Sequence, residues 1–127
     1  METDSGLSLC RLEEVSEGSA RGLTLERQGG GSLHLIVVRL AGGVRVYENR
    51  CPHRGTPLDW APDRFLDESG QYLLCSTHGA LFRLEDGECV SGPCPGEFLK
   101  IRPASVREGI VVLDAAETEF DPSARLG

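Results

Sequence analysis

Long apolar segments are missing from this sequence of 127 residues. The longest apolar runs, residues 35–38 among them, are far shorter than the roughly 20 residues that cross a bilayer. The first thirty residues carry six acidic side chains and lack the apolar core of a signal peptide. We therefore expect a soluble cytoplasmic protein with no membrane partner.

Positive charge is also sparse. Thirteen Lys and Arg residues stand against twenty Asp and Glu, which gives a formal net charge of −7. No run of Lys or Arg forms the basic stripe that neutralises phosphates, so we expect no nucleic-acid partner. The length is typical of one domain with one core and leaves no room for two independent catalytic domains. We expect a single domain over residues 1–114, followed by an acidic tail over residues 115–127.

Glycine is frequent, with 16 residues against a typical share of about 7%. Short segments with period-two apolar patterns alternate with Gly-rich turns, which predicts strands joined by hairpins. Residues 9–17 are ambiguous and could form a short helix. The expected fold is an all-β antiparallel sandwich or barrel. The expected strands are residues 21–28, 33–40, 44–47, 64–67, 71–74, 81–84, 88–90, 98–102, 105–107 and 110–113.

Two short motifs carry the chemistry of this sequence: CPHRG at residues 51–55 and CSTHG at residues 75–79. Thiolates and imidazoles are metal ligands, and the glycine that ends each motif lets backbone approach a metal centre closely. The cysteine count of five is odd, and in a reducing compartment such spacing favours metal binding over disulfides. The candidate ligands are Cys51, His53, Cys75 and His78.

The residue types alone leave two metal centres open. Two Cys and two His fit one tetrahedral zinc ion, although zinc fingers commonly place both Cys before the His pair. Here the order is Cys, His, Cys, His, with one of each in both loops. Such mixed loops suit a binuclear iron centre, in which the Cys of each loop binds one iron and the His of each loop binds the other.

The pair Cys51-x-His53 and Cys75-x-x-His78 resembles the Rieske-type [2Fe–2S] motif. The resemblance extends over roughly residues 7–114. It implies one [2Fe–2S] cluster held by these four side chains, in a cluster-binding subdomain of about residues 49–96. It also implies that a third loop, the proline-rich residues 92–96, covers the cluster. The residues expected to surround the cluster are Arg54, Gly55, Gly79, Ala80, Phe82 and Pro93.

The sequence departs from the respiratory members of that family at the cluster loops. Thr56 and Thr77 stand where those members carry the two Cys of a disulfide between the loops. Ala80 and Phe82 stand where high-potential members place a Ser and a Tyr that donate hydrogen bonds to cluster sulfur. The chain therefore resembles the low-potential, ferredoxin-like branch. Trp60 lies in an insertion between the motifs, where we expect it to pack in a local core or, as the alternative, to contact a partner.

The remaining candidate residues have weaker signals. Cys10 is expected to be a small core residue, and His34 a packed or edge histidine rather than a ligand. Cys89 and Cys94 are expected to be reduced thiols. Arg50 and Arg54 flank the first loop, as solvated charges or as contacts for an acidic partner.

The implied function is one-electron transfer between a reductase and a terminal oxidoreductase such as a dioxygenase. We expect no enzyme active site, because a mononuclear iron site of the oxygenase type needs two His and a carboxylate, and only His34 is left over. Two alternatives remain: the small subunit of a nitrite reductase, and, from another class, a zinc-stapled structural or interaction module.

Overall fold

The computed structural model describes residues 6–26, 30–52, 58–59, 64–75, 79–92 and 95–114. These residues form ten strands, which all pair antiparallel, and one 3-10 turn, η1 (Leu12–Glu14). The expected all-β class is therefore confirmed. No helix among them has the length and apolar character needed to cross a membrane. The strands are β1 (Gly6–Arg11), β2 (Ala20–Glu26), β3 (Ser32–Leu40), β4 (Gly43–Glu48), β5 (Tyr72–Cys75), β6 (Ala80–Arg83), β7 (Cys89–Ser91), β8 (Ile101–Arg102), β9 (Ala104–Arg107) and β10 (Ile110–Asp114).

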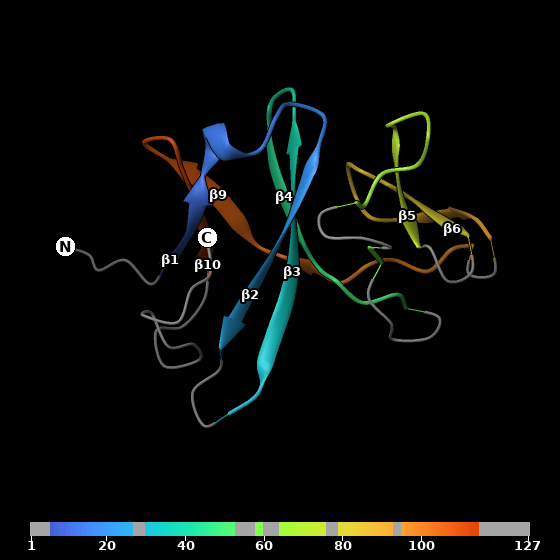
Figure 1. Ribbon diagram of the computed structural model, residues 1–127, viewed down its shortest axis with the longest axis horizontal. Coiled ribbons are helices and arrows are strands. Elements are labelled where there is room, and N and C mark those ends of the chain that lie inside the picture. Colours follow the sequence, from blue (N-terminus) through green and yellow to red (C-terminus); the bar gives the residue numbers. More distant parts are fainter. Residues whose placement is uncertain are drawn as a thin grey trace.

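The strands form three sheets, with the orders β1-β10-β9, β2-β3-β4-β8 and β5-β6-β7. In Figure 1 the strands β2, β3 and β4 stand between β1, β9 and β10 on one side and β5 and β6 on the other. Apolar side chains gather in two cores, one on each side of this middle sheet. The cysteine core consists of Ile36, Val38, Tyr47, Cys51, Leu58, Phe65, Leu73, Cys75, Ala80, Phe82, Leu84, Cys89 and Leu99. The second core consists of Leu9, Cys10, Val15, Leu23, Leu25, Leu33, Leu35, Val37, Val44, Val46, Val111 and Leu113.

Strand β3 explains one of the longest apolar runs of the sequence. Successive side chains of a strand point to opposite faces of the sheet. Ile36 and Val38 accordingly belong to the cysteine core, whereas Leu35 and Val37 belong to the second core. All four side chains are fully buried, so a continuous apolar run is what a strand between two cores requires.

The chain leaves the middle sheet after β4 and returns to it at β8, the strand that pairs with β4. Both metal-binding motifs and the proline-rich loop lie in this excursion, which spans residues 49–100. The predicted subdomain of residues 49–96 falls within it, and the division into a domain of residues 1–114 and a tail stays a prediction. The buried Tyr47 hydroxyl donates to the Leu84 carbonyl at 2.8 Å, and this bond ties the excursion to β4.

Three expected elements differ from the observed ones. The ambiguous residues 9–17 contain the end of β1 and then η1, because β1 pairs with β10. Residues 64–67 are not a strand and contribute only a bridge between Leu66 and Leu73. These residues still pair with β5, since the Leu74 N–H donates to the Phe65 carbonyl at 2.7 Å and the Asp67 N–H donates to the Tyr72 carbonyl at 3.0 Å, but the paired stretch is too short to form a strand. The expected strand 98–102 is shortened to β8.

Candidate metal centre

The first motif begins just beyond β4. The backbone N–H of Asn49 donates to the carbonyl of His34 on β3 at 2.8 Å, which continues the sheet for one more residue. Cys51 follows two residues later and is fully buried in the cysteine core, whereas Pro52 is exposed. The Cys51 thiol therefore points into the core from a point fixed by the middle sheet. His53, Arg54 and Gly55 lie outside the described residues.

The second motif begins at the last residue of β5. Cys75 is fully buried and pairs with Ala80, the first residue of β6. The N–H of Gly79 donates to the Cys75 carbonyl at 2.8 Å, and Gly79 has a φ of +74°, a conformation that glycine adopts without strain. This bond closes the second loop at its base. Ser76, Thr77 and His78 lie outside the described residues.

The two motif cysteines share one core although 24 positions separate them in the sequence. Neither thiol is accessible to water. Buried cysteine sulfurs can bind a metal as thiolates, because the metal balances their charge, so this donor set fits a metal cluster. Among the residues described, no three His, Cys, Asp or Glu side chains come together, since both motif histidines fall outside them.

Two of the residues expected to surround the cluster lie in the same core. Ala80 and Phe82 are both fully buried on the inner face of β6, where Phe82 pairs with Leu73 and Cys89. Neither carries a hydroxyl group. At these two positions the core therefore offers no side-chain hydrogen-bond donor, whatever the distance to the cluster.

The proline-rich loop starts in close contact with the second motif. A Cβ added to Gly92 would lie 2.7 Å from the Cα of Ala80 and 3.1 Å from its backbone N. Gly92 also has a φ of +101°. Only glycine allows this approach, so the loop begins directly against Ala80. Its other end is held by the Gly96 N–H, which donates to the Cys89 carbonyl at 3.1 Å. Pro93 and Cys94 lie outside the described residues.

The sequence analysis did not single out Asn49. Its side chain accepts the Leu58 N–H at 2.7 Å and donates to the Asp59 carboxylate at 3.1 Å, so it joins the two sides of the first loop. The available signal was an Asn directly after a strand, a residue whose amide often bonds to loop backbone.

The weaker candidates behave as ordinary structural residues. Cys10 is buried in the second core, as expected, and burial raises the pKa of its thiol, with an opposing effect of Arg21. His34 is exposed on β3, with its Nδ1 3.0 Å from the Thr24 hydroxyl. The Cys89 thiol is buried 3.3 Å from the Ser91 carbonyl, and Arg50 is exposed. Thr56 and Trp60 lie outside the described residues.

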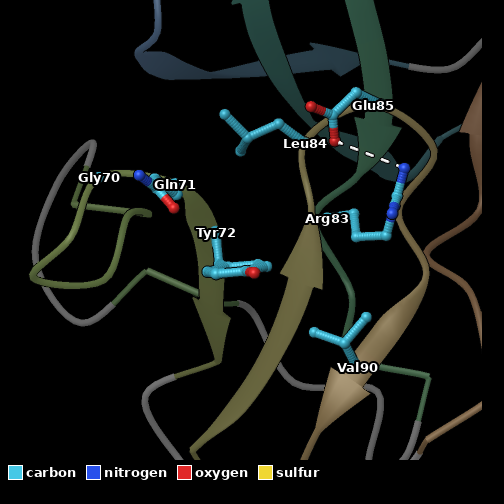
Figure 2. A pocket seen from close by; sticks show the side chains of 7 residues that line it. All are labelled: Gly70, Gln71, Tyr72, Arg83, Leu84, Glu85 and Val90. Atoms are coloured by element: carbon cyan, nitrogen blue, oxygen red, sulfur yellow. Dashed lines mark ion pairs between the residues drawn. The ribbon is translucent and has the colours of Figure 1, made fainter.

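A separate cavity of about 390 Å³ opens beside β5 and the turn after β6 (Figure 2). Arg83 and Glu85 lie next to each other on one side of it in a long ion pair of 4.0 Å, and Arg83 also contacts Asp86 at 3.2 Å. These side chains are exposed, so their pairing adds little stability. Neither motif cysteine lines the cavity, which is therefore distinct from the candidate metal centre. The lining residues are Gly70, Gln71, Tyr72, Arg83, Leu84, Glu85 and Val90.

Comparisons with solved structures point to one fold. The terminal oxygenase of carbazole 1,9a-dioxygenase from Novosphingobium sp. KA1 is similar with a TM-score of 0.70 and 24% identity, over 88% of this chain and 30% of the oxygenase chain. A chain from the complex of reduced oxygenase and oxidized ferredoxin in carbazole 1,9a-dioxygenase has a TM-score of 0.65 and 25% identity, over 91% of this chain and 98% of the other.

A third similar structure is the ferredoxin of carbazole 1,9a-dioxygenase from Nocardioides aromaticivorans IC177. Its TM-score is 0.66 and its identity 16%, over 88% of this chain and 99% of that ferredoxin. The chain thus spans less than a third of the oxygenase chain but almost the whole ferredoxin.

The sequence itself gives one family match. Comparison with curated proteins gives none. The family model described as the Rieske [2Fe-2S] domain matches residues 6–109, which include both motifs and the strands β1 to β9. The chain therefore belongs to the Rieske [2Fe-2S] domain family, and its cofactor is one [2Fe–2S] cluster.

Proposed function

We propose that this protein is a one-electron carrier whose cluster is held by two cysteines and two histidines. In this proposal Cys51 and Cys75 bind one iron, and His53 and His78 bind the other. The observation that carries it is the burial of both motif cysteines in one core of a Rieske domain. The family match also favours iron over the zinc-stapled alternative.

The proposed ligand set implies a higher reduction potential than that of a cluster held by four cysteines. When bound, the cluster accepts and releases one electron. Two neutral imidazoles in place of two thiolates remove two negative charges from the site, so an added electron meets less repulsion and the potential rises. Ala80 and Phe82 supply no hydroxyl donor, which favours the low end of the range of about −150 to +300 mV.

The proposed partners are a reductase and a terminal oxygenase such as a dioxygenase. The support is that similar chains come from structures of oxygenase and ferredoxin in complex, and that this chain matches a ferredoxin along nearly its full length. We also propose a cytoplasmic location, since thiolate ligands suit a reducing compartment.

Metal analysis of the purified protein tests the proposal. We expect about two irons and two acid-labile sulfides per chain, with a one-electron wave in voltammetry. Cys51→Ser and Cys75→Ser should each lose most of the iron. Cys10→Ser and Cys89→Ser, which change buried cysteines outside the motifs, should keep it and serve as controls. A colourless protein with one zinc ion would contradict the proposal.

A further inference from the structure

The side chain of Asn49 spans the base of the first metal-binding loop. Its Oδ1 accepts the backbone N–H of Leu58 at 2.7 Å, and its Nδ2 donates to Oδ1 of Asp59 at 3.1 Å. We call this set of three residues the Asn49 bridge. It encloses residues 50–57, the segment that contains the whole CPHRG motif.

Both sides of the bridge are fixed to the body of the protein. On the first side, the Asn49 N–H bonds to β3, and the N–H of the preceding Glu48 donates to the Lys100 carbonyl at 2.8 Å. On the other side, Leu58 is fully buried in the cysteine core together with Cys51. The bridge therefore connects two anchored points, one on each side of the motif.

The chemistry of the bridge requires an amide at position 49. The Leu58 N–H needs an acceptor, and the Asp59 carboxylate needs a donor, and a primary amide supplies both from one planar group. The requirement fixes which way the Asn49 amide faces. A carboxylate at position 49 would keep the first bond but would face the carboxylate of Asp59.

We propose that Asn49 is a positioning residue that ties together the residues on either side of the first metal-binding motif and so slows loss of the cluster. The inference rests on the proposed function, because it takes Cys51 and His53 as cluster ligands. Separation of these two anchored points would expose the buried Cys51 to water, and the rate of cluster release then follows the free energy of this local opening. Two hydrogen bonds across the base of the loop raise that free energy.

The test is an exchange of the two bridging side chains. Asn49→Asp should place two carboxylates about 3 Å apart and speed cluster loss, because like charges at hydrogen-bond distance repel. Asp59→Asn leaves an amide oxygen that still accepts from Asn49, so its effect should be small. The double variant N49D/D59N restores a donor opposite an acceptor with the bridge reversed, and its net charge equals that of the wild type. It should recover the wild-type rate of cluster loss to within about twofold. If the two substitutions acted independently, the double variant would instead lose its cluster at least as fast as Asn49→Asp.

Ser69→Ala provides a matched control. The Ser69 hydroxyl also accepts one backbone N–H, from Gln71 at 3.1 Å, and donates to one carboxylate, that of Asp67, at 2.8 Å. It does so in a turn that contains neither motif. Removal of the same two kinds of bond there should leave the rate of cluster loss unchanged.

Two measurements on the purified iron-loaded protein give the readout. The first is the bleaching rate of cluster absorbance in excess chelator, which Asn49→Ala should raise about tenfold. The second is hydrogen exchange of the Leu58 amide, whose protection should fall in Asn49→Ala and return in N49D/D59N. An iron-loaded wild type whose Asn49→Ala variant bleaches at the wild-type rate, or a double variant as fast as Asn49→Asp, would overturn the role of Asn49. A wild type without iron would overturn the proposed function instead.

Discussion

Gly92→Ala tests how tightly the proline-rich loop is seated on the second metal-binding loop. The added methyl group would meet the Ala80 Cα at 2.7 Å and the Ala80 Cβ at 3.2 Å. Ala80 is fully buried at the start of β6, so it cannot move aside without moving the strand. The substitution should therefore push the loop and the strand apart.

Gly96→Ala separates this clash from backbone strain. Gly96 has a φ of +88°, close to the +101° of Gly92, but a Cβ at position 96 would meet nothing within 4 Å. The positive φ should cost an alanine about 1–2 kcal/mol at either position. The contact with Ala80 should add about 1–3 kcal/mol at position 92 alone, the usual range for overpacking.

Thermal unfolding of the two purified variants by circular dichroism gives the comparison. Gly92→Ala should unfold below Gly96→Ala by about 4 °C for each kcal/mol of difference. Iron content, measured on the same samples, should fall in Gly92→Ala only. Equal unfolding temperatures would refute the idea that the Gly92 contact seats the loop.

Three further predictions concern the cores and the potential. Ala80→Ser should raise the midpoint potential by roughly 40 mV in voltammetry, the equivalent of about one hydrogen bond to the reduced cluster, and a lower potential would contradict the donor argument. Burial raises the pKa of Tyr47, so the hydroxyl loses its proton at a lower pH in the unfolded chain than in the folded one. The free energy of unfolding should therefore fall as pH rises above about 10, and in urea titrations Tyr47→Phe should show a smaller fall. Leu25→Ala and Leu73→Ala should each cost about 2–5 kcal/mol in such titrations, but only Leu73, in the cysteine core, should also shift the potential.

Local patterns in the sequence predicted the features that depend on neighbours along the chain. The two Cys-His motifs and the hairpin of β6 and β7 were found because their signals lie within a few residues. Cys51 and Cys75 are buried in one core, and all four metal ligands stay predictions. The family, the cofactor and the antiparallel class are confirmed.

Features that depend on distant pairing were not predictable in this way. Strand β1 remained ambiguous because its partner β10 lies at the other end of the domain, with Leu7 opposite Leu113. The Asn49 bridge joins residues nine and ten positions apart around an irregular loop, which no period in the sequence encodes. The expected strand at residues 64–67 is reduced to a single bridge, because the turn that begins at Asp67 leaves only Phe65, Leu66 and Asp67 to pair with β5.

The adjacency of β4 and β8 has a consequence for how the protein folds. The excursion between them contains a meander of three short strands whose contacts are close in sequence, so it has low contact order and can form early. The sheet of β1, β10 and β9 must instead wait for its two most distant strands to meet. We therefore expect two cooperative units in native-state hydrogen exchange, one of which is the excursion that carries both metal-binding motifs.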